Sequence, residues 1–128
     1  MMHRPPQPKS GTHRREREDE RLLAFEVQAR GGLVEKMAPT RRGVPDRLVL
    51  LRGRAHLIEM KTRRGRLSPW QIRWHEAAER TGVMVTTLYG ADEVRQWLAR
   101  IDDEDEVRRW IEGINEMAAP DGGETDVL

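Results

Sequence analysis

Two carboxylates and one lysine are spaced so that a β-hairpin would bring them together. Asp46 directly precedes the apolar run 47–51, and Glu59 and Lys61 follow the next apolar run. A short turn at 52–54 joins the two runs, a pattern that is typical of a hairpin. Antiparallel pairing would place Asp46 opposite Glu59. Lys61 would share the face of Glu59, because strand side chains alternate with a period of two.

This cluster could bind a divalent metal ion. Carboxylate oxygens are hard ligands that suit Mg²⁺ or Mn²⁺. A bound divalent ion acidifies its water and neutralises charge on a phosphoryl oxygen, and a nearby ammonium can position that water. The alternative interpretation makes Asp46 a turn residue, and Glu59 and Lys61 exposed polar residues of a strand. The paired spacing and the many nearby arginines favour the catalytic interpretation.

Three motifs contain or follow these residues in a fixed order. They are Gly43-x-Pro45-Asp46, Glu59-x-Lys61 and Gly65-x-Leu67-Ser68-x-x-Gln71. Over about residues 18–100 this pattern resembles the virus-type replication-repair nuclease (VRR-Nuc) domain, a branch of the PD-(D/E)XK nuclease superfamily. The resemblance implies a Mg²⁺- or Mn²⁺-dependent endodeoxyribonuclease, which is a hydrolase of phosphodiester bonds.

The resemblance also implies roles for individual residues. Asp46 and Glu59 would bind the metal ion, together with the backbone carbonyl of Met60. Lys61 would orient or activate the attacking water, and Gln71 would assist.

A further carboxylate on the first helix is implied as a catalytic and metal-binding residue. Glu20 has the expected spacing before the glycine pair 31–32. Glu18 and Glu26 are the other candidates, and a solvated Glu20 is the alternative.

Arginines surround the motifs and would contact the DNA backbone. The predicted DNA-binding residues are Arg41, Arg42, Arg63, Arg64 and Arg66. Contacts to phosphate carry no base information, so we expect recognition of DNA shape rather than sequence. Ordinary surface arginines are the alternative. Trp70 and Trp74 stand one helical turn apart and predict either core packing or stacking on a base. His56 and His75 are assigned no chemistry.

Substrate and assembly follow from the resemblance alone. It implies a homodimer that acts on branched DNA such as a four-way (Holliday) junction, in the cytoplasm of a bacterial or phage-infected cell. It implies no membrane and no small-molecule cofactor. Three alternatives stay open: a non-catalytic DNA-binding or assembly module, a restriction- or repair-type nuclease with another substrate, and an interaction protein led by the acidic C-terminal segment.

Composition and charge divide the chain into three parts. Its 128 residues suit one domain, and the absence of cysteine excludes disulfides and thiolate chemistry. Residues 1–17 carry five Lys/Arg and one Glu and predict a flexible basic arm, while 18–100 carry sixteen Lys/Arg and eleven Asp/Glu. Residues 101–128 carry two Arg and ten Asp/Glu and predict an acidic helix with a disordered tail.

The order of predicted elements gives the fold class. We expect helices at 18–30, 69–81, 91–100 and 102–118, and strands at 33–37, 47–51, 55–61 and 83–89. Ser68 and Pro69 form a strong helix-start signal. The sequence therefore predicts an α/β (α+β) fold: a PD-(D/E)XK restriction-endonuclease-like αβββαβ core, with a mixed central sheet flanked by helices, plus an extra C-terminal helix.

Overall fold

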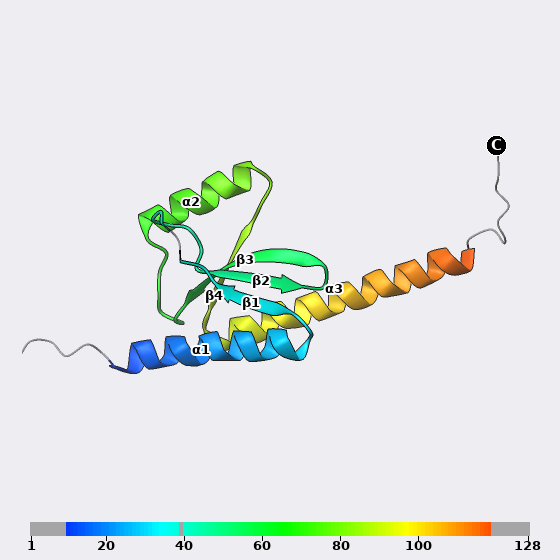
Figure 1. Cartoon of the computed structure of the whole chain (residues 1–128), viewed down its shortest axis with the longest axis horizontal. Coiled ribbons are helices and arrows are strands. Elements are labelled where there is room, and N and C mark those ends of the chain that lie inside the picture. Colours follow the sequence, from blue (N-terminus) through cyan, green and yellow to red (C-terminus); the bar gives the residue numbers. More distant parts are fainter. Residues whose placement is uncertain (1–9, 39, 119–128) are drawn as a thin grey trace, which may run out of the picture.

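The structure, a computed structural model, describes residues 10–38 and 40–118 and confirms the αβββαβ order (Figure 1). The elements are α1 (Ser10–Ala29), β1 (Leu33–Lys36), β2 (Arg47–Leu51), β3 (Arg54–Lys61), α2 (Pro69–Arg80), β4 (Val85–Tyr89) and α3 (Gly90–Ala118). The sheet is mixed, with the order β1-β2-β3-β4; only the β3–β4 pair is parallel. In the described part of the chain, no helix has the length and apolar character needed to cross a membrane.

The predicted β2–β3 hairpin is present, but its turn is one residue shorter than the predicted turn at 52–54, because Arg54 already pairs in β3. Leu51 pairs with Arg54 and Arg47 pairs with Ile58, so the connection contains only Arg52 and Gly53. Both turn residues have positive φ angles, 54° and 77°. A two-residue turn of this kind matches the twist of the flanking strands. The turn also fixes the pairing at the other end of the hairpin, where Arg47 pairs with Ile58. Asp46 and Glu59 are the neighbours of this pair in the chain.

The hydrophobic core lies between the sheet and the pair of helices α1 and α3. These helices run side by side on one face of the sheet, whereas α2 lies on the other side (Figure 1). The core residues are Leu23, Val27, Val49, Leu51, Ile58, Met60, Leu88, Val94, Trp97, Leu98 and Ile101. Since Ile58 and Met60 face this core, Glu59 and Lys61 project toward the side of α2.

Two predicted helix boundaries were wrong. α1 begins at Ser10 rather than Glu18, so residues 10–17 of the predicted flexible arm are helical. Once the apolar face of α1 is packed, extension through Arg and Glu residues costs little, because both are good helix formers. The remaining predicted arm and tail, residues 1–9 and 119–128, lie outside the described residues.

The two predicted C-terminal helices form one continuous helix, α3, of 29 residues. No glycine or proline separates them, and the packed Ile101 carries the helix across the expected break. The acidic segment after it was expected to begin a new helix. Instead Asp102 binds Arg30 next to α1, and Asp105 binds Arg108 and Arg109 of α3, so arginines offset part of the acidic charge and the helix continues.

Candidate active site

The hairpin brings Asp46, Glu59 and Lys61 together at one end of the sheet. Arg47 pairs with Ile58 at this end of the ladder. Asp46 comes directly before Arg47 in the chain, and Glu59 comes directly after Ile58. Lys61 Nζ lies 3.8 Å from Glu59 Oε1. The Glu59 residue is only 5% exposed, so its charge is held largely out of water. The predicted clustering of the three residues is therefore present.

Each carboxylate has one buried oxygen without a hydrogen-bond partner. These atoms are Asp46 Oδ1 and Glu59 Oε2. A buried unpaired carboxylate oxygen is costly, and a hard divalent cation is the ligand that would satisfy two such atoms at once. Among the described residues, no group of three or more His, Cys, Asp or Glu side chains forms a metal site. A metal ion at Asp46 and Glu59 would therefore complete its coordination with backbone carbonyls and waters, as Mg²⁺ commonly does.

The electrostatics of Glu59 support the same interpretation. Burial, and after it the negative charge of Asp46, raises the pKa of Glu59 to about 7. Lys61, the backbone N–H of Asp46 and Arg47 oppose the rise in this pKa. A positive ion between the two carboxylates would offset both the burial of the Glu59 charge and its repulsion by Asp46, and so would lower this pKa.

Gln71 is oriented toward Glu59 by the start of α2. Ser68 is the N-cap, as predicted, and its Oγ accepts a hydrogen bond from the Gln71 N–H at 3.2 Å. The Gln71 side-chain oxygen accepts in turn from the Ser68 N–H at 2.8 Å, which completes a capping box. Its oxygen is thus occupied, so Nε2 points away from the cap and donates to Glu59 Oε1 at 2.5 Å. The helix cap fixes which end of the amide meets the carboxylate.

Gly43 allows α2 to approach the strand that carries Asp46. Its φ is +91°, and a Cβ there would lie 2.2 Å from the Trp70 carbonyl oxygen. Gly43 therefore combines a positive φ with a close approach to the backbone of α2. Any side chain at this position would separate the Gly43 loop from the helix that presents Gln71.

We therefore expect Gly43→Ala to lower the free energy of unfolding by about 2–4 kcal/mol, from backbone strain and overpacking together. Urea unfolding would measure the change. Gly82→Ala is a matched control, since Gly82 has a φ of +94° and no atom within 4 Å of the added Cβ. It should cost about 1–2 kcal/mol from backbone conformation alone. Equal losses in the two variants would show that the contact with Trp70 is unimportant.

Arg47 is a buried member of the site that the sequence reasoning missed. The residue is 5% exposed, and its guanidinium lies 2.7 Å from Glu20 Oε1 and 3.1 Å from Asp46 Oδ2. It also donates to the Asp46 backbone carbonyl at 3.0 Å. The available signal was its position, since it alternates with the core residues Val49 and Leu51 and must point inward.

The three candidate glutamates of α1 occupy different surroundings. Glu20 is joined to Asp46 through Arg47, so it lies beside the carboxylate cluster while its charge is paired. Glu26 binds Arg30, which also holds Asp102 of α3, so Glu26 serves the contact between α1 and α3. Glu18 lines a hollow on the basic loop after β3. The metal-binding role of Glu20 stays a prediction.

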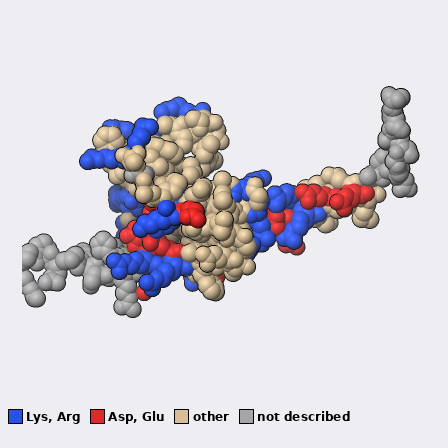
Figure 2. Space-filling view, viewed as in Figure 1, with Lys and Arg blue, Asp and Glu red and all other residues tan. Residues whose placement is uncertain are grey.

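The predicted DNA-binding arginines are all exposed; they are Arg41, Arg42, Arg63, Arg64 and Arg66. Arg63 and Arg64 line a hollow of about 480 Å³ together with Arg15 of α1. Figure 2 shows basic side chains over α2 and over the adjoining end of α1, with acidic atoms between them. The positive charge therefore lies on the side of the molecule that carries the carboxylate cluster.

Trp70 is an exposed aromatic residue on this basic side. It is 49% exposed, whereas Trp74 is half-buried, and neither tryptophan belongs to the hydrophobic core, so the structure does not show the predicted core packing. The guanidinium groups of Arg42 and Arg73 lie 5.7 Å and 5.4 Å from the centre of the Trp70 ring. These cation–π contacts hold Arg42 next to α2.

His75, to which the sequence assigned no chemistry, lies one helical turn after Gln71. Its Nε2 is buried and has no hydrogen-bond partner. Burial lowers the pKa of His75, and the positive charge of Lys61 lowers it further. The imidazole is therefore kept neutral near the lysine.

Comparisons with known proteins agree with this fold. The chain is 40% identical over 80 residues to "Putative nuclease p44" of Acyrthosiphon pisum secondary endosymbiont phage 1, a match that covers 59% of this chain and 86% of that protein. Among solved structures, it is similar to a chain described as "VRR_NUC domain", with a TM-score of 0.61 and 30% identity over 66% of this chain and 95% of that one. No family model matches the sequence.

The fold, the motifs and the relatives point in one direction. The αβββαβ order holds Asp46, Glu59 and Lys61 at one end of the sheet, and almost the full length of a known VRR-Nuc structure superposes on this chain. The resemblance first drawn from the motifs is thus supported both by overall fold and by sequence identity with a phage protein named as a nuclease. The chain belongs to the VRR-Nuc family of nucleases.

Proposed function

We propose that this nuclease is a metal-dependent, structure-selective DNA endonuclease that works as a homodimer on branched DNA such as a four-way junction. The observation that carries the metal dependence is the pair of buried, unpartnered oxygens Asp46 Oδ1 and Glu59 Oε2. They come from opposite strands of the hairpin and lie beside Lys61, which is the donor set expected of a Mg²⁺ or Mn²⁺ site.

Each residue of the cluster has a role in this proposal. Asp46 and Glu59 hold the Mg²⁺ or Mn²⁺ ion, with the backbone carbonyl of Met60 as a further ligand and Glu20 as the candidate from α1. The ion supplies an acidified water and neutralises charge on the phosphoryl group. Lys61 orients the water for in-line attack at phosphorus. Gln71 holds the Glu59 carboxylate in place through its 2.5 Å hydrogen bond.

The positive charge of the exposed arginines suits a polyanionic substrate such as DNA. In this proposal a phosphate backbone would contact Arg42, which packs on Trp70, and the loop arginines Arg63 and Arg64, which line a hollow beside α1. Such contacts follow backbone shape and carry no base information, which supports structure selection. A homodimer suits a four-way junction because two symmetric sites can nick two strands. The phage origin of the relative supports action in the cytoplasm of a phage-infected cell.

The test is cleavage of a labelled four-way junction beside linear duplex and single strands of the same sequence, each with Mg²⁺, Mn²⁺ or EDTA. Paired nicks in the junction alone, lost in EDTA, are the expected result. Metal-dependent cutting of every substrate would retain the chemistry and overturn the junction preference. Binding without any cutting would favour a non-catalytic DNA-binding module.

Lys61→Ala should abolish cleavage and leave junction binding largely intact. Lys61 lies 3.8 Å from Glu59 and would act on the water, whereas the exposed arginines contact the backbone. Band-shift titration in Ca²⁺ would measure binding, and gel assays in Mg²⁺ would measure cleavage. Lys36→Ala, an exposed lysine on β1, is the control and should retain both. Equal loss of binding and cleavage in Lys61→Ala would make the lysine structural.

A further inference from the structure

The outer half of α3 extends beyond the sheet (Figure 1), and it carries a stripe of exposed apolar side chains. The exposed fractions are 54% for Val107, 68% for Trp110, 47% for Ile111, 43% for Ile114 and 88% for Met117. We call these five residues the outer stripe. They recur every three or four residues, so they form one continuous face of the helix.

The protein's own core cannot cover the outer stripe. The part of α3 that packs on the sheet and α1 presents Val94, Leu98 and Ile101 to the core, and this face ends at the buried Asp105. With 3.6 residues per turn, the outer stripe falls on roughly the opposite side of the same helix. Asp105 faces Arg52 of the hairpin turn, whose Nε lies 3.6 Å from Asp105 Oδ2. Rotation of the helix to bury the stripe would break this ion pair.

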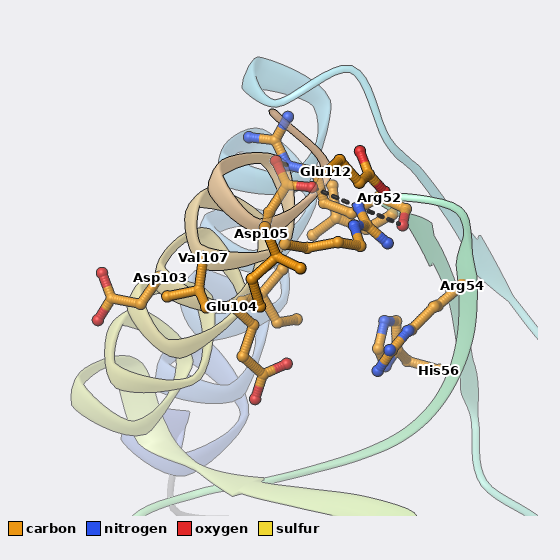
Figure 3. A pocket seen from close by; sticks show the side chains of 12 residues that line it. Arg52, Arg54, His56, Asp103, Glu104, Asp105, Val107 and Glu112 are labelled. Atoms are coloured by element: carbon orange, nitrogen blue, oxygen red, sulfur yellow. Dashed lines mark hydrogen bonds and ion pairs between the residues drawn. The ribbon is translucent and has the colours of Figure 1, made fainter. Parts of the chain in front are cut away.

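A groove of about 480 Å³ opens beside the outer stripe, between the tip of the hairpin and α3. Figure 3 shows Arg54 and His56 on the hairpin side and Glu104 and Val107 on the helix side. Leu51 and Ile101 also line the groove, and its walls are mainly apolar. Val107 belongs to both features, so the groove and the stripe form one continuous apolar surface.

We propose that the outer stripe is the interface with a second copy of this chain, in which the outer halves of two α3 helices pack antiparallel. This inference rests on the homodimer of the proposed function and names its surface. A twofold axis near residue 112 would place Val107 of one copy against Met117 of the other, and Trp110 against Ile114. Met117, the most exposed member of the stripe, would then reach the mouth of the partner's groove.

Area and charge both favour a second copy. Covering the five side chains of the stripe on both copies would bury roughly 1,200 Å² in total. For comparison, one aromatic side chain buries about 150–250 Å². That total reaches the lower end of stable interfaces. Four acidic residues, 103–106, directly precede the stripe, and antiparallel packing about residue 112 keeps the acidic segments of the two copies at opposite ends of the interface. Parallel packing would align like charges.

The first test is the mass of the full chain by size-exclusion chromatography with light scattering, in EDTA and without DNA. The wild type should be a dimer. Trp110→Glu should be a monomer, or raise the dimer dissociation constant at least about 100-fold, since a central tryptophan commonly dominates an interface. Phe25→Glu is a matched control, because Phe25 is also a 68% exposed aromatic residue on a helix, and it should stay a dimer. A monomeric wild type, or a dimeric Trp110→Glu, would overturn the proposal.

Disulfide trapping tests the antiparallel arrangement, and the chain contains no cysteine to confuse the result. A mixture of Val107→Cys chains and Met117→Cys chains should form a covalent heterodimer on mild oxidation. Neither variant alone should cross-link, because the antiparallel packing keeps identical positions apart. Efficient cross-linking of Val107→Cys with itself would overturn the antiparallel arrangement.

Cleavage assays separate this proposal from the proposed function. Monomeric Trp110→Glu should still nick one strand, because the Asp46–Glu59 cluster lies within one chain, while paired nicking of a junction should be lost. A dimer through α3 that cleaves no DNA would retain the interface and reject the enzyme. A monomer that still makes paired nicks would reject the interface and retain the enzyme.

Discussion

Glu59→Gln is expected to lower the rate of metal-dependent cleavage by about a thousandfold or more. The carboxylate supplies a charged ligand to the proposed metal ion, and loss of that ion's charge stabilisation is worth several kcal/mol in the transition state. The amide keeps the shape of the side chain and can still accept the hydrogen bond from Gln71. Single-turnover cleavage in Mg²⁺ and Mn²⁺ would measure the loss. Activity within tenfold of wild type would exclude Glu59 as a ligand.

The same substitution should make the metal-free protein more stable at alkaline pH. The pKa of Glu59 is raised from 4.5 to about 7 in the folded state, mainly by burial and then by Asp46. The folded protein therefore holds this proton more tightly than the unfolded chain, so stability falls as pH rises from about 4.5 through 7. At pH 8 the buried charge costs up to about 3 kcal/mol, a cost that glutamine avoids.

Urea unfolding in EDTA at pH 5 and pH 8 would measure this difference. The wild type should lose more stability between the two pH values than Glu59→Gln does. Glu35→Gln replaces an exposed glutamate on β1 and should behave like the wild type. If Glu59→Gln and the wild type showed the same pH dependence, the carboxylate would not be destabilised by its surroundings. Single-turnover cleavage would measure the catalytic role of Glu59, and urea unfolding would measure how much its buried charge destabilises the folded protein.

Arg47→Met is expected to lower the free energy of unfolding by about 3–5 kcal/mol in the absence of metal. The substitution leaves Glu20 and Asp46 near one another without the buried guanidinium that now binds both, and a buried charge without its partner is strongly destabilising. Urea unfolding in EDTA would measure the loss. Arg54→Met, at an exposed arginine on β3, should change stability by no more than about 0.5 kcal/mol.

Two further measurements identify the cause of this effect. Adding Glu20→Gln to Arg47→Met should restore part of the stability, because one of the two unpaired charges is removed. Mn²⁺ should stabilise Arg47→Met more than it stabilises the wild type, since the ion would neutralise carboxylates that no longer have an arginine. If Arg47→Met were as stable as Arg54→Met, the ion pairs of Arg47 would contribute nothing to the site.

The local parts of the site could be predicted from the sequence because short-range rules determine them. A two-residue turn and the alternation of strand side chains place Asp46, Glu59 and Lys61 together. The Ser68 signal starts α2 at the predicted residue and positions Gln71 in its first turn. The order of elements followed from the same kind of pattern, and its agreement with the motifs identified the fold.

Only the tertiary structure decided how distant charges are paired. Arg47 binds Glu20 of α1, and Arg30 binds Asp102 of α3, a residue 72 positions further along the chain. Periodicity shows that a side chain points inward but does not show which charge from another element will meet it. For this reason the sequence favoured Glu20 by its spacing alone and left Glu18 and Glu26 as other candidates on α1. It also placed a helix break before Asp102, where arginine pairing instead keeps α3 continuous and leaves its outer stripe exposed.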